Sequence, residues 1–197
     1  MCAAFCLLFV LCRPPDAHAL PPREIIMDPP AAVVEDGMII LRLALTVDNE
    51  EGLFTLLKDG AVLELGVSVL VERERTLWRN AKAVGVDFSS ILQHDPLSRD
   101  FVLRVPTPEG EKEVRDRNLS RLLQASWRRL ALPVASLEEL RRKEPAASYQ
   151  VVLTVSLRHT GVPPWLERSS LFWSAEVVPQ VKRRFFFTPP PARANNR

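Results

Sequence analysis

Two histidines lie beyond the first twenty residues, and their neighbours decide what chemistry they could support. His94 is followed by Asp95 and preceded by Ser90, which are the residue types of a serine hydrolase triad. An adjacent histidine and aspartate in a turn cannot adopt the usual orienting geometry, and the sequence contains no nucleophile elbow. His94 and His159 also lack a second histidine at metal-ligand spacing. The sequence therefore predicts no catalytic residue, no cofactor-binding residue and no metal ligand.

Two pairs of acidic residues, Glu50-Glu51 and Glu138-Glu139, are the other candidates for acid/base chemistry. Both pairs stand at expected helix starts, where the helix dipole favours negative side chains. The seven glycines occur singly, so the sequence contains no glycine-rich phosphate loop. The alternative to a non-catalytic function is a hydrolase of the cell envelope whose site is assembled from such ordinary carboxylates.

The first of two basic and aromatic clusters is a candidate partner-binding site. It consists of Arg73, Arg75, Trp78 and Arg79, where a long strand is expected to reverse. Arginine and tryptophan are enriched among the residues that contribute most to protein interfaces. The alternative interpretation is a solvated hairpin end, in which glutamate and arginine side chains pair across the strands.

The second cluster lies near the C-terminus, where Lys182, Arg183 and Arg184 precede three phenylalanines that begin with Phe185. Such a segment could make a weak contact with an anionic membrane surface. The alternative is a last strand whose charges protect a sheet edge from unwanted pairing. The partner that we expect is another envelope protein and not a nucleic acid, because a net charge of +2 lacks the strongly basic character of nucleic-acid binders.

The N-terminal segment, residues 1–19, has the pattern of a signal peptide. Ala3–Leu11 is a short apolar run, and Ala17-His18-Ala19 is the small-x-small pattern that signal peptidases recognise. No lysine or arginine precedes the apolar run, although a positive start is usual. We expect cleavage after Ala19 and a bacterial protein that is periplasmic or otherwise extracytoplasmic.

All three cysteines, Cys2, Cys6 and Cys12, fall within this signal segment. A mature chain that begins at Leu20 would therefore be cysteine-free, which excludes disulfides, thiolate metal sites and cysteine nucleophiles. The composition as a whole is that of an ordinary globular protein, with 47% hydrophobic and 25% charged residues among 197.

Hydrophobic periodicity predicts the elements that would carry these residues. Alternating apolar positions indicate strands, and capped segments with one apolar side indicate helices. The expected strands are 38–47, 61–74, 84–88, 101–105, 110–115, 149–157 and 171–178, and the expected helices are 50–58, 119–130 and a short one after Ser136. Short turns between strands favour antiparallel pairing. The predicted fold class is α+β, mostly antiparallel β sheet or sandwich with two or three short helices.

Prolines mark the two ends of the chain and bound a compact middle. Residues 20–35 are expected to form an extended lead-in, and residues 36–187 a single β-rich domain. Residues 188–197 are expected to be a disordered proline-rich tail. A domain of this size buries enough surface to fold without disulfides or metals.

The order of several short motifs resembles a known family. Along the chain come Asp59-Gly60, the run Glu72-Arg73-Glu74-Arg75, Trp78, Arg99-Asp100-Phe101, Val162-Pro163-Pro164 and Phe172-Trp173-Ser174. Over residues 36–189 this order is similar to the proteobacterial domain-of-unknown-function family 4390, although family members often carry paired aromatics where Trp78 stands alone. That family has no established activity, so the resemblance implies no catalytic residues. We therefore expect a non-catalytic, exported accessory or interaction module of the cell envelope.

Overall fold

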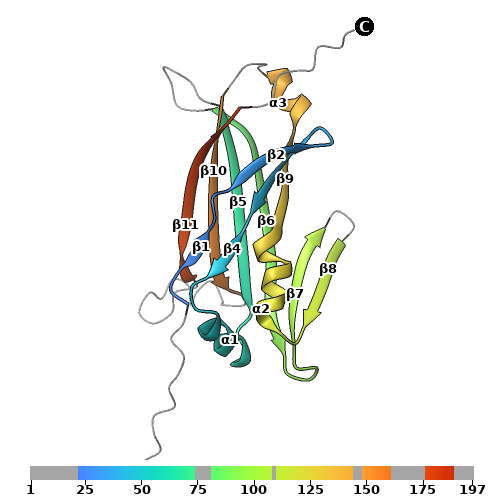
Figure 1. Cartoon of the computed structure of the whole chain (residues 1–197), viewed down its shortest axis with the longest axis vertical. Coiled ribbons are helices and arrows are strands. Elements are labelled where there is room, and N and C mark those ends of the chain that lie inside the picture. The colour runs from blue at the N-terminus through green and yellow to red at the C-terminus, as the bar shows by residue number, and fades with distance from the viewer. Residues whose placement is uncertain (1–21, 74–80, 108–109, 144–147, 161–175, 189–197) are drawn as a thin grey trace, which may run out of the picture.

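The computed structural model describes residues 22–73, 81–107, 110–143, 148–160 and 176–188, and antiparallel strands make up most of it (Figure 1). The strands within these ranges are β1 (Ile25–Met27), β2 (Ala31–Glu35), β3 (Met38–Leu43), β4 (Leu45–Val47), β5 (Leu63–Arg73), β6 (Ala81–Asp95), β7 (Asp100–Thr107), β8 (Gly110–Asp116), β9 (Leu130–Ser136), β10 (Tyr149–His159) and β11 (Glu176–Phe187). The helices in the same ranges are α1 (Glu50–Lys58), α2 (Leu119–Ala125), α3 (Leu137–Lys143) and a 3-10 turn, η1 (Trp127–Arg129). The predicted α+β class, mostly antiparallel sheet with short helices, is confirmed.

Six strands form the largest sheet, in the order β11-β10-β5-β6-β7-β8, and every neighbouring pair is antiparallel. The two strands β5 and β10 pair along their whole length, with Val69 opposite Leu153. Leu65, Val67 and Val69 are buried, because alternate side chains of β5 point to the same face of the sheet. The intervening side chains point to the opposite face.

Two smaller sheets cover one face of this long sheet. Strands β2, β3 and β9 form one of them, β1 and β4 form the other, and in Figure 1 both cross in front of the long strands. Their apolar side chains, such as those of Leu41 and Leu132, join the buried side chains of the long sheet in one cluster. We call the covered face of the long sheet the inner face, and its opposite the outer face.

The helices are short, and local hydrogen bonds fix their positions. Helix α1 has the predicted bounds, and the Asn49 side chain caps it by accepting a hydrogen bond of 3.1 Å from the backbone N–H of Gly52. The Tyr149 hydroxyl donates a hydrogen bond of 3.0 Å to the backbone carbonyl of Leu140, which ties α3 to the long sheet. Within the described ranges, no helix is long and apolar enough to cross a membrane.

The predicted helix over residues 119–130 is wrong in its second half. Helix α2 ends at Ala125, the η1 turn follows, and Leu130 begins strand β9. The Ser126 hydroxyl donates to the Leu122 carbonyl, a local bond that competes with helix continuation. Pro133 argues against a strand in the sequence, but it lies on β9 at a register shift of an edge strand, where proline is tolerated.

The two ends of the described chain contribute more strands than the sequence pattern indicates. The segment expected as a lead-in carries β1 and β2, and Ile25 and Met27 of β1 are buried in the core. The last strand was expected at residues 171–178, whereas β11 continues to Phe187. Residues 171–175, the expected signal segment and all of the expected tail except Thr188 lie outside the described ranges. The packed part of the chain therefore begins upstream of residue 36.

Candidate interaction surface

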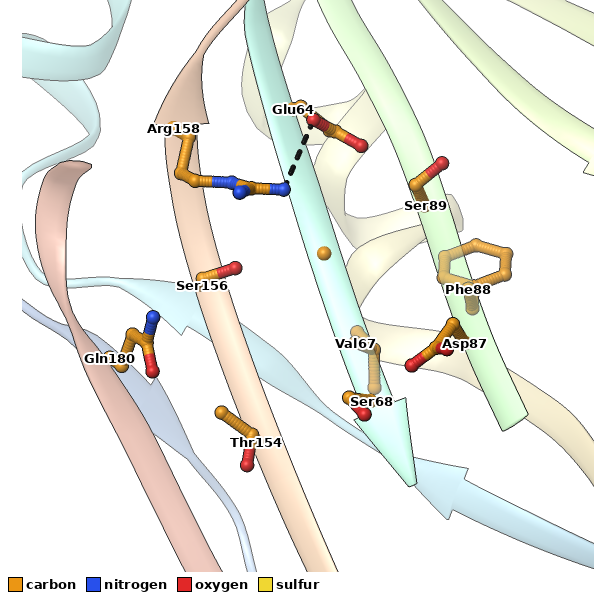
Figure 2. Close-up of a pocket in the computed structure, with 11 residues that line it drawn as sticks. Glu64, Val67, Ser68, Asp87, Phe88, Ser89, Thr154, Ser156, Arg158 and Gln180 are labelled. Carbon is orange, nitrogen blue, oxygen red and sulfur yellow. Dashed lines mark hydrogen bonds and ion pairs between the residues drawn. The ribbon is translucent and has the colours of Figure 1, made fainter. Parts of the chain in front are cut away.

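A shallow polar groove of about 420 Å³ lies on the outer face of the long sheet. Figure 2 shows its lining, which comes from the four adjacent strands β11, β10, β5 and β6. The polar side chains are Glu64 and Ser68 of β5, Asp87 and Ser89 of β6, Thr154, Ser156 and Arg158 of β10, and Gln180 of β11. These are the strand positions that alternate with the buried ones, so the same periodicity that builds the core also places hydroxyl, amide and charged groups in the groove.

A glycine forms the floor of the groove. Gly66 of β5 lies opposite Ser89 on one neighbouring strand and opposite Ser156 on the other. A Cβ at this position would come within 3.0 Å of the Ser156 Oγ, closer than side chains normally approach. The missing side chain therefore leaves both serine hydroxyls accessible from the outer face.

The carboxylates that line the groove are Glu64 and Asp87. Glu64 accepts a hydrogen bond of 3.4 Å from an Arg158 guanidinium nitrogen across the strand pair. Asp87 lies opposite Ser68, four residues along β5 from Glu64, which corresponds to about 13 Å at the rise of a strand. Carboxyl pairs that act together on one glycosidic bond stand roughly 5–9.5 Å apart. The spacing suits contacts along an extended ligand better than joint action on a single bond.

Strand β11 borders this surface and places cations on both of its faces. Lys182 lies opposite the groove residue Thr154, and Arg184 lies opposite Val152, so both project from the outer face. Arg183 alternates with them and lies opposite Leu153. All three side chains are exposed, and none forms an ion pair with an acid among the described residues. We call Lys182, Arg183 and Arg184 the cationic edge.

The phenylalanines that follow the cationic edge differ in exposure. Phe185 and Phe187 pack against the core from the inner face, opposite Val151 and Tyr149. Phe186 projects from the outer face with 61% of its surface exposed. A single exposed aromatic, in register with Lys182 and Arg184, therefore extends the surface toward the end of β11.

The sequence-predicted hairpin cluster falls mostly outside the described residues. Arg75, Trp78 and Arg79 lie in the range 74–80, and the expected cleavage site Ala19 also lies outside, so these hypotheses stay predictions. Arg73 is described: it ends β5, lies opposite Tyr149, and has a further interaction partner.

The register brings the start of that cluster to the end of β11. Tyr149 of β10 pairs with Arg73 on one side and with Phe187 on the other. Two strand spacings, about 10 Å, therefore separate Arg73 from Phe187. Arg73, the first residue of the hairpin cluster, and Phe187, the last residue of β11, therefore lie at the same end of the long sheet.

The residues considered for a triad have separate structural partners. Ser90 is buried on the inner face, and its Oγ accepts a hydrogen bond of 3.2 Å from the Trp127 indole nitrogen. Asp95 accepts the backbone N–H of Leu97 in the following turn. His94 lies beside Lys58, with 2.9 Å between Nε2 and Nζ.

The electrostatics of the two described histidines favour their neutral forms. Partial burial and then the positive charge of Lys58 lower the pKa of His94 below its ordinary value. Burial also lowers the pKa of His159. Within the described ranges, no group of three or more histidine, cysteine, aspartate or glutamate side chains is placed to hold a metal ion.

The geometry defines a two-layer antiparallel β protein whose outer face is polar, is not covered by any described element, and ends in a cationic edge. The family described as a domain of unknown function (DUF4390) matches residues 23–184, and the chain belongs to this family. The resemblance stated from the motifs is thus confirmed, and the match starts upstream of residue 36, where β1 and β2 join the sheets. No curated protein and no solved structure shows a significant match to the chain.

Proposed function

We propose that this chain is a non-catalytic interaction module of the cell envelope, and that another envelope protein binds to its outer face. The observation that supports this proposal is the continuous polar surface formed by the groove and the cationic edge of β11. The surface lies on four strands of one sheet, and sheet-borne sites hold their side chains in fixed positions.

The chemistry of the groove suits a reversible polar contact. Its serine and threonine hydroxyls each offer a donor and an acceptor, and the Gln180 amide offers both as well. A partner that replaces water at these groups exchanges hydrogen bonds at little net cost, whereas the charges on the rim increase the rate of encounter. The N-terminal segment supports an extracytoplasmic location, because Ala17-His18-Ala19 follows a short apolar run.

The export part of this proposal is tested by the mass of the mature protein. Expression of the full chain in a bacterial host should give a periplasmic product that begins at Leu20. Recovery of the protein only with Met1 retained would contradict export. The result does not depend on the identity of any partner.

The binding part is tested by filling the groove. Ser68 is exposed, so Ser68→Trp should leave the melting temperature close to that of the wild type and remove capture of the partner from solubilised envelopes. Lys112→Trp on β8 is the matched control, since it places the same side chain at an exposed strand position away from the groove. Equal capture by the two variants would contradict a role for the outer face.

A further inference from the structure

We propose that an acidic, extended segment of the partner adds to the long sheet as a seventh strand, alongside β11. This inference rests on the proposed function, because it specifies how a partner of the outer face would be held. Strand addition uses backbone hydrogen bonds for affinity and alternate side chains for specificity. The cationic edge and Phe186 supply those side chains.

Among the described residues, strand β11 has a free edge over residues 181–187. It pairs with β10 from Val181 to Phe187 without a register shift, and no described strand pairs with its other edge. An edge strand of this kind presents a row of unpaired N–H and C=O groups to an incoming chain. Pro179 lacks an N–H, and the pairing with β10 shifts register beyond Val181, so the usable edge is the segment 181–187.

The distribution of charge favours a strand over a membrane. Lys182 and Arg184 project from the outer face, whereas Arg183 projects from the other face. A strand that enters the plane of the sheet places its own side chains on both faces and reaches all three cations. A flat bilayer surface would contact the cations on one face only. Within the described residues, Phe186 is also the one largely exposed aromatic of β11 that could insert into a bilayer.

The same charges disfavour a second copy of this chain as the partner strand. If two β11 strands paired antiparallel around Arg183, Lys182 of each copy would lie opposite Arg184 of the other, and the two Arg183 side chains would lie opposite each other. Like charges directly opposite destabilise a strand pair. Acidic residues at those positions turn the repulsion into attraction. The edge is therefore selective for a segment with three consecutive acids and an apolar residue two positions further on, opposite Phe186.

The probe for this proposal is the peptide Thr-Val-Thr-Asp-Glu-Asp-Thr-Val-Thr, whose symmetry allows either strand direction. Its control replaces the acids with Asn-Gln-Asn. We expect the full mature chain to bind the acidic peptide at least ten times more tightly than the control at low salt, measured by fluorescence anisotropy. Hydrogen exchange of the edge-facing backbone amides in 181–187 should slow when the acidic peptide is bound.

Charge reversal provides the matched variants. Arg184→Glu should weaken binding of the acidic peptide at least tenfold, and Arg129→Glu, an exposed arginine on η1, should leave it unchanged. Binding without slower exchange in β11, or amides already protected in the free protein, would overturn strand addition. Binding of the chain to phosphatidylglycerol vesicles that depends on Arg184, without peptide binding, would assign the edge to a membrane instead.

The outcome separates this inference from the proposed function. If the peptide does not bind but Ser68→Trp still removes capture of the partner, the outer face is an interaction surface and strand addition is wrong. If the peptide binds and the capture is insensitive to Ser68→Trp, the edge is a binding site and the groove is not part of it.

Discussion

The two edge strands of the long sheet, β8 and β11, carry similar numbers of charged side chains. Charged side chains of β8 form ion pairs within the molecule, whereas the cations on β11 form none among the described residues. On β8, Glu113 accepts hydrogen bonds from Arg104 and Arg115, at 3.2 and 2.6 Å. Nearby, Asp116 accepts two from Arg121, at 2.6 and 2.7 Å. On β11, three adjacent cations have no ion-pair partner among the described acids.

Charge on an edge strand therefore has two separate effects. Both edges are protected from unspecific pairing, because an incoming apolar strand would have to desolvate charged groups. At β8 the charges are neutralised within the molecule, so that edge attracts neither sign. At β11 the positive field stays available, so the protection applies to most chains but not to an acidic one.

The largest expected change in stability concerns β10, the strand that pairs with β11. Leu153 of β10 is fully buried, and Leu153→Ala should lower the free energy of unfolding by about 2–5 kcal/mol. Thr154→Ala, the neighbouring residue on the outer face, should cost far less. Urea denaturation of both variants measures the contrast, and equal losses would mean that the inner and outer faces of β10 are wrongly assigned.

A smaller effect should distinguish the β8 edge by its response to acid. The two hydrogen bonds from Arg121, with the backbone N–H of Asn118, lower the pKa of Asp116 to about 2, from an ordinary value of 3.8. The unfolded chain binds the proton more readily, so this contribution to stability is complete above the ordinary value and is lost as the pH falls toward 2.

Asp116→Asn should therefore flatten the dependence of stability on pH between about 4 and 2. Asp36→Asn, at an exposed turn, removes the same charge and is the control for the change in net charge. Thermal melts across this window provide the measurement, and an NMR titration of the Asp116 carboxyl should give a midpoint near 2. A midpoint at the ordinary value would show that the Arg121 pair does not form in solution.

The smallest expected change in stability follows from removing one arginine at each edge, and its sign should differ between β11 and β8. Arg184→Thr removes one of three adjacent like charges and should raise stability by about 0.2–0.5 kcal/mol at low salt. Arg115→Thr removes a hydrogen-bond partner of Glu113 and should instead lower stability slightly. Both changes should largely disappear in about 1 M salt, where screening is nearly complete. The same sign for both variants would remove the distinction between the edges.

The sequence predicts those parts of the fold in which periodicity and capping agree. Leu63 to Val71 and Tyr149 to Leu157 alternate cleanly, and β5 and β10 follow them. Helix α1 was predicted with its bounds because its leucines share one side, Asp48 or Asn49 could cap its N-terminus, and Gly60 follows its end. The structure has Asn49 as the cap. Strand β9 was missed because Leu130 also continues the helical spacing of α2 and because Pro133 interrupts the strand pattern.

The candidate surface depended on information that the sequence pattern does not contain. Lys182, Arg183 and Arg184 were recognised as a charged segment with two interpretations, but only the pairing with β10 divides them between the two faces. The groove was missed entirely, because Gly66, Ser89 and Ser156 are ordinary strand residues until the register places them side by side. A hydroxyl-rich outer face is visible in sequence only after the order of the strands is known.

The pairing of β5 with β10 also determines when the long sheet can form during folding. Glu64 and Arg158 meet across these strands although 94 residues separate them in the chain. The pairing of β5 with β10 can therefore be completed only after residue 159 has been synthesised, and such distant pairing makes folding slow. For the exported chain that we propose, this delay is useful, because a polypeptide threaded through a membrane channel must still be unfolded when it arrives there.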